Sequence, residues 1–95
     1  MKSGFEWDDK KATANLKKHK ISFEEATTIF DDPLMITFPD TQHSDEEDRC
    51  IGIGKTDKGI ILVVVHIDKE ETIRLISCRK ATASERRRYE KGEDK

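Results

Sequence analysis

Residues 59–67 read GIILVVVHI, an apolar run that would present hydrophobic side chains on both sides of an extended chain. Successive side chains of a strand point to opposite faces of a sheet. A strand of this composition is therefore stable only where both of its faces are covered, as in the middle of a sheet. We expect residues 60–68 to form the central strand of this protein.

Three further strands are expected around this one. Residues 34–39 (LMITFP) form a short strand that Pro39 ends, which favours a sheet edge. Residues 49–56 and 72–80 both alternate between apolar and polar side chains. The TDKG sequence at 56–59 is typical of a type I turn with Gly59 in a left-handed conformation, and KEE at 69–71 is a second turn. Consecutive strands joined by short turns predict an antiparallel meander of about four strands.

Three helices complete the prediction. Asp8 caps a first helix that runs to about His19, after FEW at 5–7 has entered as an extended segment. A second helix begins after Ser22 and ends before Pro33, and a third begins after Thr82 and ends near residue 92. The order helix, helix, meander, helix is that of an α+β domain.

The first helix has two candidate contact sides. Its spacing places Ala12, Leu16 and His19 on the side expected to face inward. An adjacent stripe carries Trp7, Lys11, Asn15 and Lys18.

Length and charge bound the possible functions. Ninety-five residues make one domain, with a core at about 5–92. The net charge is −2, with six Lys and Arg against twelve Asp and Glu in residues 1–48, and twelve against eight in residues 49–95. An acidic balance argues against a dedicated duplex DNA binder but leaves room for a local basic site in the second half. The acidic run at 44–49 is expected to be a solvated loop, or alternatively a surface for a basic partner.

Several classes of protein and site are not supported. No apolar run approaches the length of a membrane span, and no leader segment is recognisable, so we expect a cytoplasmic protein without membrane contact. Cys50 and Cys78 lie in predicted strands without C-x-x-C spacing, which favours reduced side chains over a disulfide. The three histidines and two cysteines lack metal-ligand spacing, and GIG at 52–54 lacks the rest of a dinucleotide loop. We therefore expect no metal and no cofactor.

Strand register suggests where basic side chains gather. Symmetric turns on both sides of the central strand would set Arg49 and Arg74 directly opposite His66, in a row across three strands. Two arginines beside a histidine are unfavourable unless an anion lies among them. The row therefore predicts a phosphate site, although a slip of one residue in either hairpin would abolish it. Arg74 and Arg79 are expected on opposite faces of the sheet.

Each of these residues also has a structural interpretation. His66 on a central strand is often a core histidine, and His19 is favoured at the end of a helix by the helix dipole. Arg74 and Arg79 are placed to pair with glutamates of neighbouring elements. The arginines at 86–88 point in three directions around the last helix, so at least one of them is ordinary surface.

Two segments of the chain resemble a known family. The first pattern is F-x-W-D-x-x-K-x-x-x-N-x-x-K-H-x-x-x-F, and the second is R-x-I-S-x-R-x-A-T-x-x-E-R-x-x-Y. In this sequence they fall on Phe5, Trp7, Asp8, Lys11, Asn15, Lys18, His19 and Phe23, then on Arg74, Ile76, Ser77, Arg79, Ala81, Thr82, Glu85, Arg86 and Tyr89. With Asp32-Pro33 between them, these motifs resemble the BrnT toxins of bacterial type II toxin–antitoxin pairs. Relatives often carry glycine where this chain has Lys20.

The resemblance implies a fold and an activity. BrnT-like proteins look like the RelE superfamily, with helices on a small antiparallel sheet. They cleave RNA without a metal and block translation. A cognate BrnA-like antitoxin, a small DNA-binding protein, neutralises the toxin, and the complex reaches operator DNA only through that antitoxin. Related proteins assemble as two toxins with two antitoxins.

Combining the resemblance with the register assigns candidate roles. We expect Arg74 and Arg49 to hold the phosphate and His66 to carry the proton, with His19 as the alternative proton carrier. Lys11, Lys18, Arg79 and Arg86 are the candidate RNA-positioning residues. Two alternatives remain open, namely a non-catalytic interaction module, and a degenerate toxin that acts only in complex formation and operon autoregulation.

Overall fold

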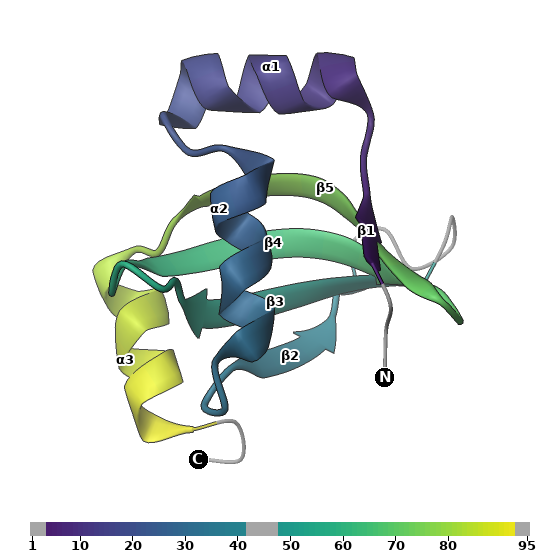
Figure 1. The fold of residues 1–95 in the computed structure, drawn as a ribbon. Coiled ribbons are helices and arrows are strands. Elements are labelled where there is room, and N and C mark those ends of the chain that lie inside the picture. The colour runs from purple at the N-terminus through teal and green to yellow at the C-terminus, as the bar shows by residue number, and fades with distance from the viewer. Residues whose placement is uncertain (1–3, 42–47, 93–95) are drawn as a thin grey trace.

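The computed structural model describes residues 4–41 and 48–92, and it contains three α-helices, a short 3-10 helix and one sheet (Figure 1). Residues 44–47 of the acidic loop lie outside this description. The sheet has five strands in the order β1-β5-β4-β3-β2. The elements in chain order are β1 (Gly4–Glu6), α1 (Asp9–His19), α2 (Phe23–Thr27), η1 (Thr28–Asp31), β2 (Ile36–Pro39), β3 (Arg49–Lys55), β4 (Ile61–Asp68), β5 (Thr72–Lys80) and α3 (Ala83–Lys91).

The apolar run forms the middle strand β4, as expected, and both of its faces are covered. α2 and η1 cross one face (Figure 1), which we call the α2 face. Its core consists of Ile21, Phe23, Ala26, Ile29, Leu62, Val64, Ile73, Leu75 and Cys78. α3 packs on the opposite face, the α3 face, over a smaller core of Ile36, Ile53, Val63, Ala81 and Tyr89. The α+β class is confirmed.

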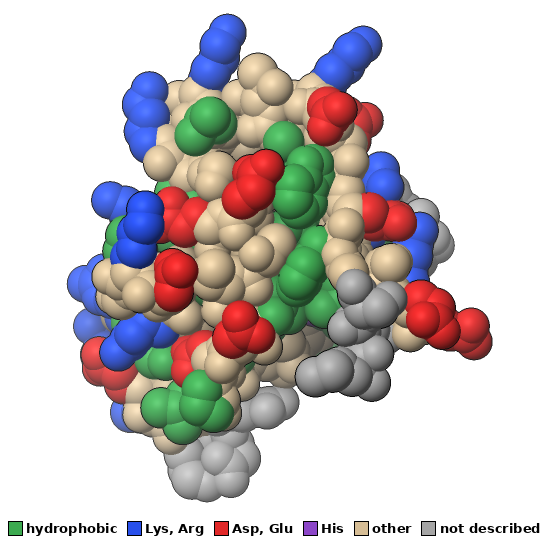
Figure 2. All heavy atoms as spheres, viewed as in Figure 1, with side chains coloured by type: hydrophobic (Ala, Val, Ile, Leu, Met, Phe, Trp, Pro, Cys, Tyr) green, Lys and Arg blue, Asp and Glu red, His purple; other side chains and the backbone are tan. Residues whose placement is uncertain are grey.

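The strand count differs from the prediction because the entry segment joins the sheet. Gly4–Glu6 pairs in parallel with Thr72–Arg74 of β5, so the meander of four strands becomes a mixed sheet of five. β1 thereby gives hydrogen-bond partners to the outer edge of β5 at its first three residues. Phe5 of this strand packs against Phe30 of η1, with the two rings tilted and their centroids 5.3 Å apart. The space-filling view shows the apolar strip that runs between β1 and α2 (Figure 2).

The predicted row of Arg49, His66 and Arg74 is wrong by one residue in each hairpin. Arg49 and Arg74 both pair with Ile67, whereas His66 pairs with Cys50 and Leu75. Neighbouring residues of a strand point to opposite faces, so the two arginines lie on the α3 face and His66 lies on the α2 face.

A bulge in β5 also overturns the expectation for Arg79. Val65 pairs with Ser77 while the next residue, His66, pairs with Leu75, which leaves Ile76 as an extra residue. The extra residue places Arg79 on the same face as Arg74. The two arginines pair with Val63 and Ile67, which are four residues apart on the regular strand β4 and so share a face. Alternation counted along the sequence could not anticipate the extra residue.

The predicted inward side of α1 is only partly confirmed. Ala12 and His19 are half-buried, but Leu16 is 48% exposed, and the buried residue of the helix is Asn15. The reason is that α1 packs against β5 at the side of the sheet rather than flat on the core (Figure 1). None of the helices among the described residues has the length and apolar character required to span a bilayer.

Candidate functional site

A hollow of about 230 Å³ lies between α1 and β5, and we call it the α1–β5 hollow. Its lining combines one face of the helix with the bulged part of the strand. The lining residues are Lys11, Ala14, Asn15, Lys18, His19, Ile76 and Ser77. Two ammonium groups and an imidazole therefore meet in one concave place, and no carboxylate lines it among the described residues.

Helical spacing explains why these side chains meet. Lys11, Asn15 and Lys18 are four and three residues apart, so they form one stripe along α1. Asp8 begins the helix by accepting hydrogen bonds from the backbone N–H groups of Lys10 and Lys11. His19 is the last residue of α1, so its imidazole stands at the end of the stripe.

Asn15 fastens this stripe to the strand. Its Nδ2 donates to the carbonyl oxygen of Cys78 at 2.9 Å, and its Oδ1 accepts from the backbone N–H of Cys78 at 3.0 Å. Nδ2 also lies 3.3 Å from the carbonyl oxygen of Ile21, beyond the end of the helix. These contacts fix the position of α1 relative to β5, the strand that carries Ser77.

Arg49 and Arg74 lie together on the α3 face, on either side of Ile67. Arg74 donates to the Glu6 carboxylate at 3.3 Å, and Lys69 donates to the same oxygen at 2.9 Å. The hydrogen bond from Lys69 and then the contact with Arg74 hold the pKa of Glu6 below its usual value. Arg74 remains about one-third exposed beside its partner.

Arg79 and Arg86 are engaged with the protein. The Arg79 guanidinium makes two parallel hydrogen bonds of 2.8 Å to the Glu85 carboxylate, which lower the pKa of Glu85 to about 2. Arg86 donates to the carbonyl oxygen of Ala81 at 3.3 Å. The alternative interpretation of Arg79 as the partner of a nearby glutamate is therefore confirmed.

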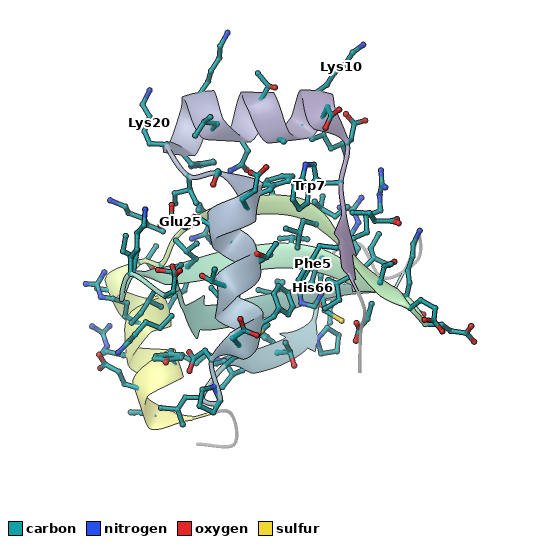
Figure 3. The ribbon with its side chains drawn as sticks, in the orientation of Figure 1. Phe5, Trp7, Lys10, Lys20, Glu25 and His66 are labelled. Atoms are coloured by element: carbon teal, nitrogen blue, oxygen red, sulfur yellow. The ribbon has the colours of Figure 1, made fainter. Side chains whose placement is uncertain are left out.

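His66 is inside the protein (Figure 3), and the strand pairing places it on the opposite face of the sheet from Arg49 and Arg74. It is 3% exposed, and its ring meets that of Phe30 edge to face with centroids 5.0 Å apart. Burial lowers its pKa, and neither ring nitrogen has a hydrogen-bond partner among the described residues. At this position the side chain cannot reach RNA on the surface.

Sequence reasoning missed two polar contributors to the hollow. Ser77 lines it beside Ile76, the extra residue of the bulge, and the sequence has no evident marker for that bulge. Asn15 had a signal, since it stands between Lys11 and Lys18 on the polar stripe and an amide can both donate to and accept from a strand.

The geometry defines the class as a small α+β domain whose cationic hollow, containing one histidine, suits a phosphate group. The chain matches the family model described as ribonuclease toxin, BrnT, of type II toxin–antitoxin system over residues 7–85. It therefore belongs to the BrnT ribonuclease toxin family. No curated protein sequence matches the chain significantly.

A solved structure agrees with this assignment. The crystal structure of the Brucella abortus ribonuclease toxin, BrnT, is similar with a TM-score of 0.66 and 26% sequence identity. The likeness covers 83% of this chain and 96% of the Brucella chain. The match thus extends over nearly the whole length of that toxin.

Proposed function

We propose that this toxin is a metal-independent endoribonuclease and that the α1–β5 hollow holds the scissile phosphate. The observation that carries the proposal is the meeting of Lys11, Lys18 and His19 in one hollow beside β5. Lys11 and Lys18 neutralise the phosphate, and His19 transfers a proton. His19 was the alternative to His66, and burial of His66 now favours it.

The chemistry needs three functions. A base removes the proton of the ribose 2′-OH, whose oxygen attacks phosphorus, and the bond from phosphorus to the 5′-oxygen breaks. An acid gives a proton to that departing oxygen, and cations stabilise the charge that gathers on the phosphate oxygens. His19 supplies one of the proton transfers, and the two lysines supply the stabilisation.

The choice of a metal-free route rests on the donor set. Divalent cations in phosphoryl-transfer sites are held by carboxylates together with phosphate oxygens. The hollow offers ammonium groups, which repel such a cation and can take over its electrostatic role. A cleavage reaction that continues in EDTA is the expected result.

Arg49 and Arg74 are proposed to bind flanking phosphates on the α3 face rather than the reacting one. Arg74 is exposed enough to exchange Glu6 for a phosphate. Arg79 positions α3 through Glu85, and Arg86 is left with a peripheral role in RNA positioning.

Membership of a type II toxin–antitoxin family implies an antitoxin partner and an RNA substrate. We propose that the partner is a BrnA-like DNA-binding protein, assembled with this chain as two toxins and two antitoxins. Operator DNA is then bound only through the antitoxin. Cleavage of RNA in the cytoplasm would inhibit translation.

The test compares two double variants of the same helix. Lys11→Ala/Lys18→Ala removes the two charges that line the hollow, whereas Lys10→Ala/Lys17→Ala removes two charges from a separate hollow on the outer side of α1. Loss of transition-state stabilisation predicts a fall in cleavage rate of about 100-fold or more for the first variant only. The measurement is cleavage of purified RNA in EDTA, with folding checked by circular dichroism.

Equal activity of the two double variants would remove the hollow from the mechanism. If folded wild-type protein cuts no RNA, with or without ribosomes, the interaction module or the degenerate toxin becomes the better description. Growth arrest on induction, relieved by co-expression of the antitoxin, separates an active toxin from a degenerate one.

A further inference from the structure

Asn15 makes contacts that are unusual for a helical side chain. It is 7% exposed, and its amide pairs with both backbone groups of Cys78, as the edge of a neighbouring strand would do. Cys78 Sγ also lies 3.1 Å from Nδ2. The side chain thereby satisfies an edge position of β5 that no strand covers.

A short segment of the outer edge of β5 lies between two sets of hydrogen-bond partners. β1 pairs with β5 as far as Arg74, and Asn15 pairs with Cys78. Residues 75–77, which include the bulge, lie between these two sets. Ile76 and Ser77 of this segment form the strand side of the α1–β5 hollow.

We propose that Asn15 is a positioning residue for RNA cleavage, because its pairing with Cys78 sets the distance of Lys11, Lys18 and His19 from this open segment. The proposal rests on the function proposed for the hollow. Lys11 lies four residues before Asn15, and Lys18 and His19 lie three and four residues after it, so movement at Asn15 displaces all three.

The apolar contact of α1 with the core is made by the half-buried Ala12. Leu16 is 48% exposed, and Asn15 is the one buried side chain of the helix. Truncation at Asn15 would also leave the N–H and C=O groups of Cys78 without their partner. We therefore expect α1 to shift or water to enter at this position, while the hydrogen bonds between the strands of the sheet are retained.

The first measurement uses Cys78 as a reporter of α1 docking. In a Cys50→Ala background Cys78 is the only thiol of the chain, and it is 1% exposed beneath Asn15. We expect Asn15→Ala to accelerate maleimide labelling of Cys78 at least tenfold under native conditions. Ile29→Val, a core change within η1, serves as a destabilised control and should leave labelling nearly unchanged.

The second measurement is single-turnover and steady-state RNA cleavage by the same variants, corrected for the folded fraction. We expect Asn15→Ala to lower kcat at least tenfold with a smaller change in KM, because the lysines remain on the helix but are misplaced. Asn15→Asp provides a rescue, since a protonated carboxyl can again donate to and accept from Cys78. Its activity relative to wild type should rise as the pH falls from 8 to 5, and that of Asn15→Ala should stay flat.

The outcomes separate this inference from the proposed function. If Asn15→Ala folds and keeps full kcat while Lys11→Ala/Lys18→Ala is inactive, Asn15 is not a positioning residue although the hollow is the site. Full activity of both variants overturns the site and the inference together. If Asn15→Ala does not fold, Asn15→Asp decides, and an activity relative to wild type that is independent of pH contradicts the inference.

Discussion

Lys20 has a backbone conformation that lysine rarely adopts. It follows α1 with φ of 63° and ψ of 28°, in the left-handed region, while its N–H closes the helix onto the carbonyl oxygen of Leu16. Glycine avoids the clash of Cβ in this conformation and is the usual residue where a helix ends in this way.

We therefore expect Lys20→Gly to raise the free energy of unfolding by about 1 kcal/mol. The measurement is urea denaturation of both proteins at neutral pH. Lys17→Gly, inside the same helix, is the matched control and should lower stability by about 0.5–1 kcal/mol. A loss of stability in Lys20→Gly would show that the left-handed residue is not strained.

His66 links stability to pH. Its pKa is lowered by burial, against a smaller opposing effect of Asp68, and Cys50 stands opposite it on β3. Because the folded pKa lies below the ordinary value of 6.5, the unfolded state binds a proton first as the pH falls.

The free energy of unfolding should therefore decrease as the pH falls below about 6.5. His66→Leu should show a smaller decrease over pH 7 to 5, since the other two histidines are unchanged. Urea midpoints of both proteins across this range provide the comparison. Parallel curves would mean that His66 does not account for the dependence.

At the scale of the element, α3 shows how one ion pair organises a helix. Thr82 and Glu85 make a reciprocal capping box, with Thr82 Oγ1 accepting from the Glu85 N–H and the Glu85 carboxylate accepting from the Thr82 N–H. The same carboxylate holds the Arg79 guanidinium of β5. Tyr89 fixes the other end by donating to Asp32 at 2.6 Å.

Glu85→Gln keeps the shape of the side chain but removes the charge. We expect a loss of up to about 1 kcal/mol, because glutamine still offers an oxygen to the capping box and the lost ion pair with Arg79 is partly exposed. The folded pKa of about 2 lies below the ordinary 4.5, so this contribution is intact above pH 4.5 and disappears as the pH falls toward 2. Thermal unfolding of both proteins at pH 7 and pH 3 should show a smaller difference at the lower pH.

At the scale of the whole molecule, opposite charges occupy neighbouring elements. Figure 2 shows lysines around α1 and acidic side chains along α2. The net charge of the chain is −2, yet basic side chains occur on the parts that we propose to contact RNA. These parts are α1, β5 and the arginines of the α3 face.

Salt dependence tests this arrangement. Three phosphates, the scissile one held by Lys11 and Lys18 and two flanking ones on Arg49 and Arg74, predict a slope of about −2 for log affinity against log salt concentration with single-stranded RNA. Lys11→Ala/Lys18→Ala should reduce the slope to about −1.4, and Lys10→Ala/Lys17→Ala should leave it unchanged. Binding is measured with RNA that carries a 2′-O-methyl group at every position, which blocks cleavage. A slope that neither double variant alters would place the RNA elsewhere.

Local signals in the sequence were sufficient to predict most elements. The caps at Asp8, Ser22 and Thr82, the turn at Gly59 and the apolar run of β4 were confirmed, as were free cysteines in β3 and β5. These features depend on interactions between residues close in the chain or on burial of a single segment. The BrnT family was likewise identified from motifs within two segments and confirmed.

The arrangement of the site was decided by tertiary structure. One extra residue in β5 moved Arg79 to the face of Arg74, and one residue of register moved His66 into the core. The pairing of Asn15 with Cys78 joins residues 63 positions apart and creates the hollow. Alternation along a strand reverses with every inserted residue, and a helix side chain finds its strand partner only after the sheet has formed. The sequence by itself therefore determined the elements and the family, whereas packing between distant segments decided which charged side chains meet.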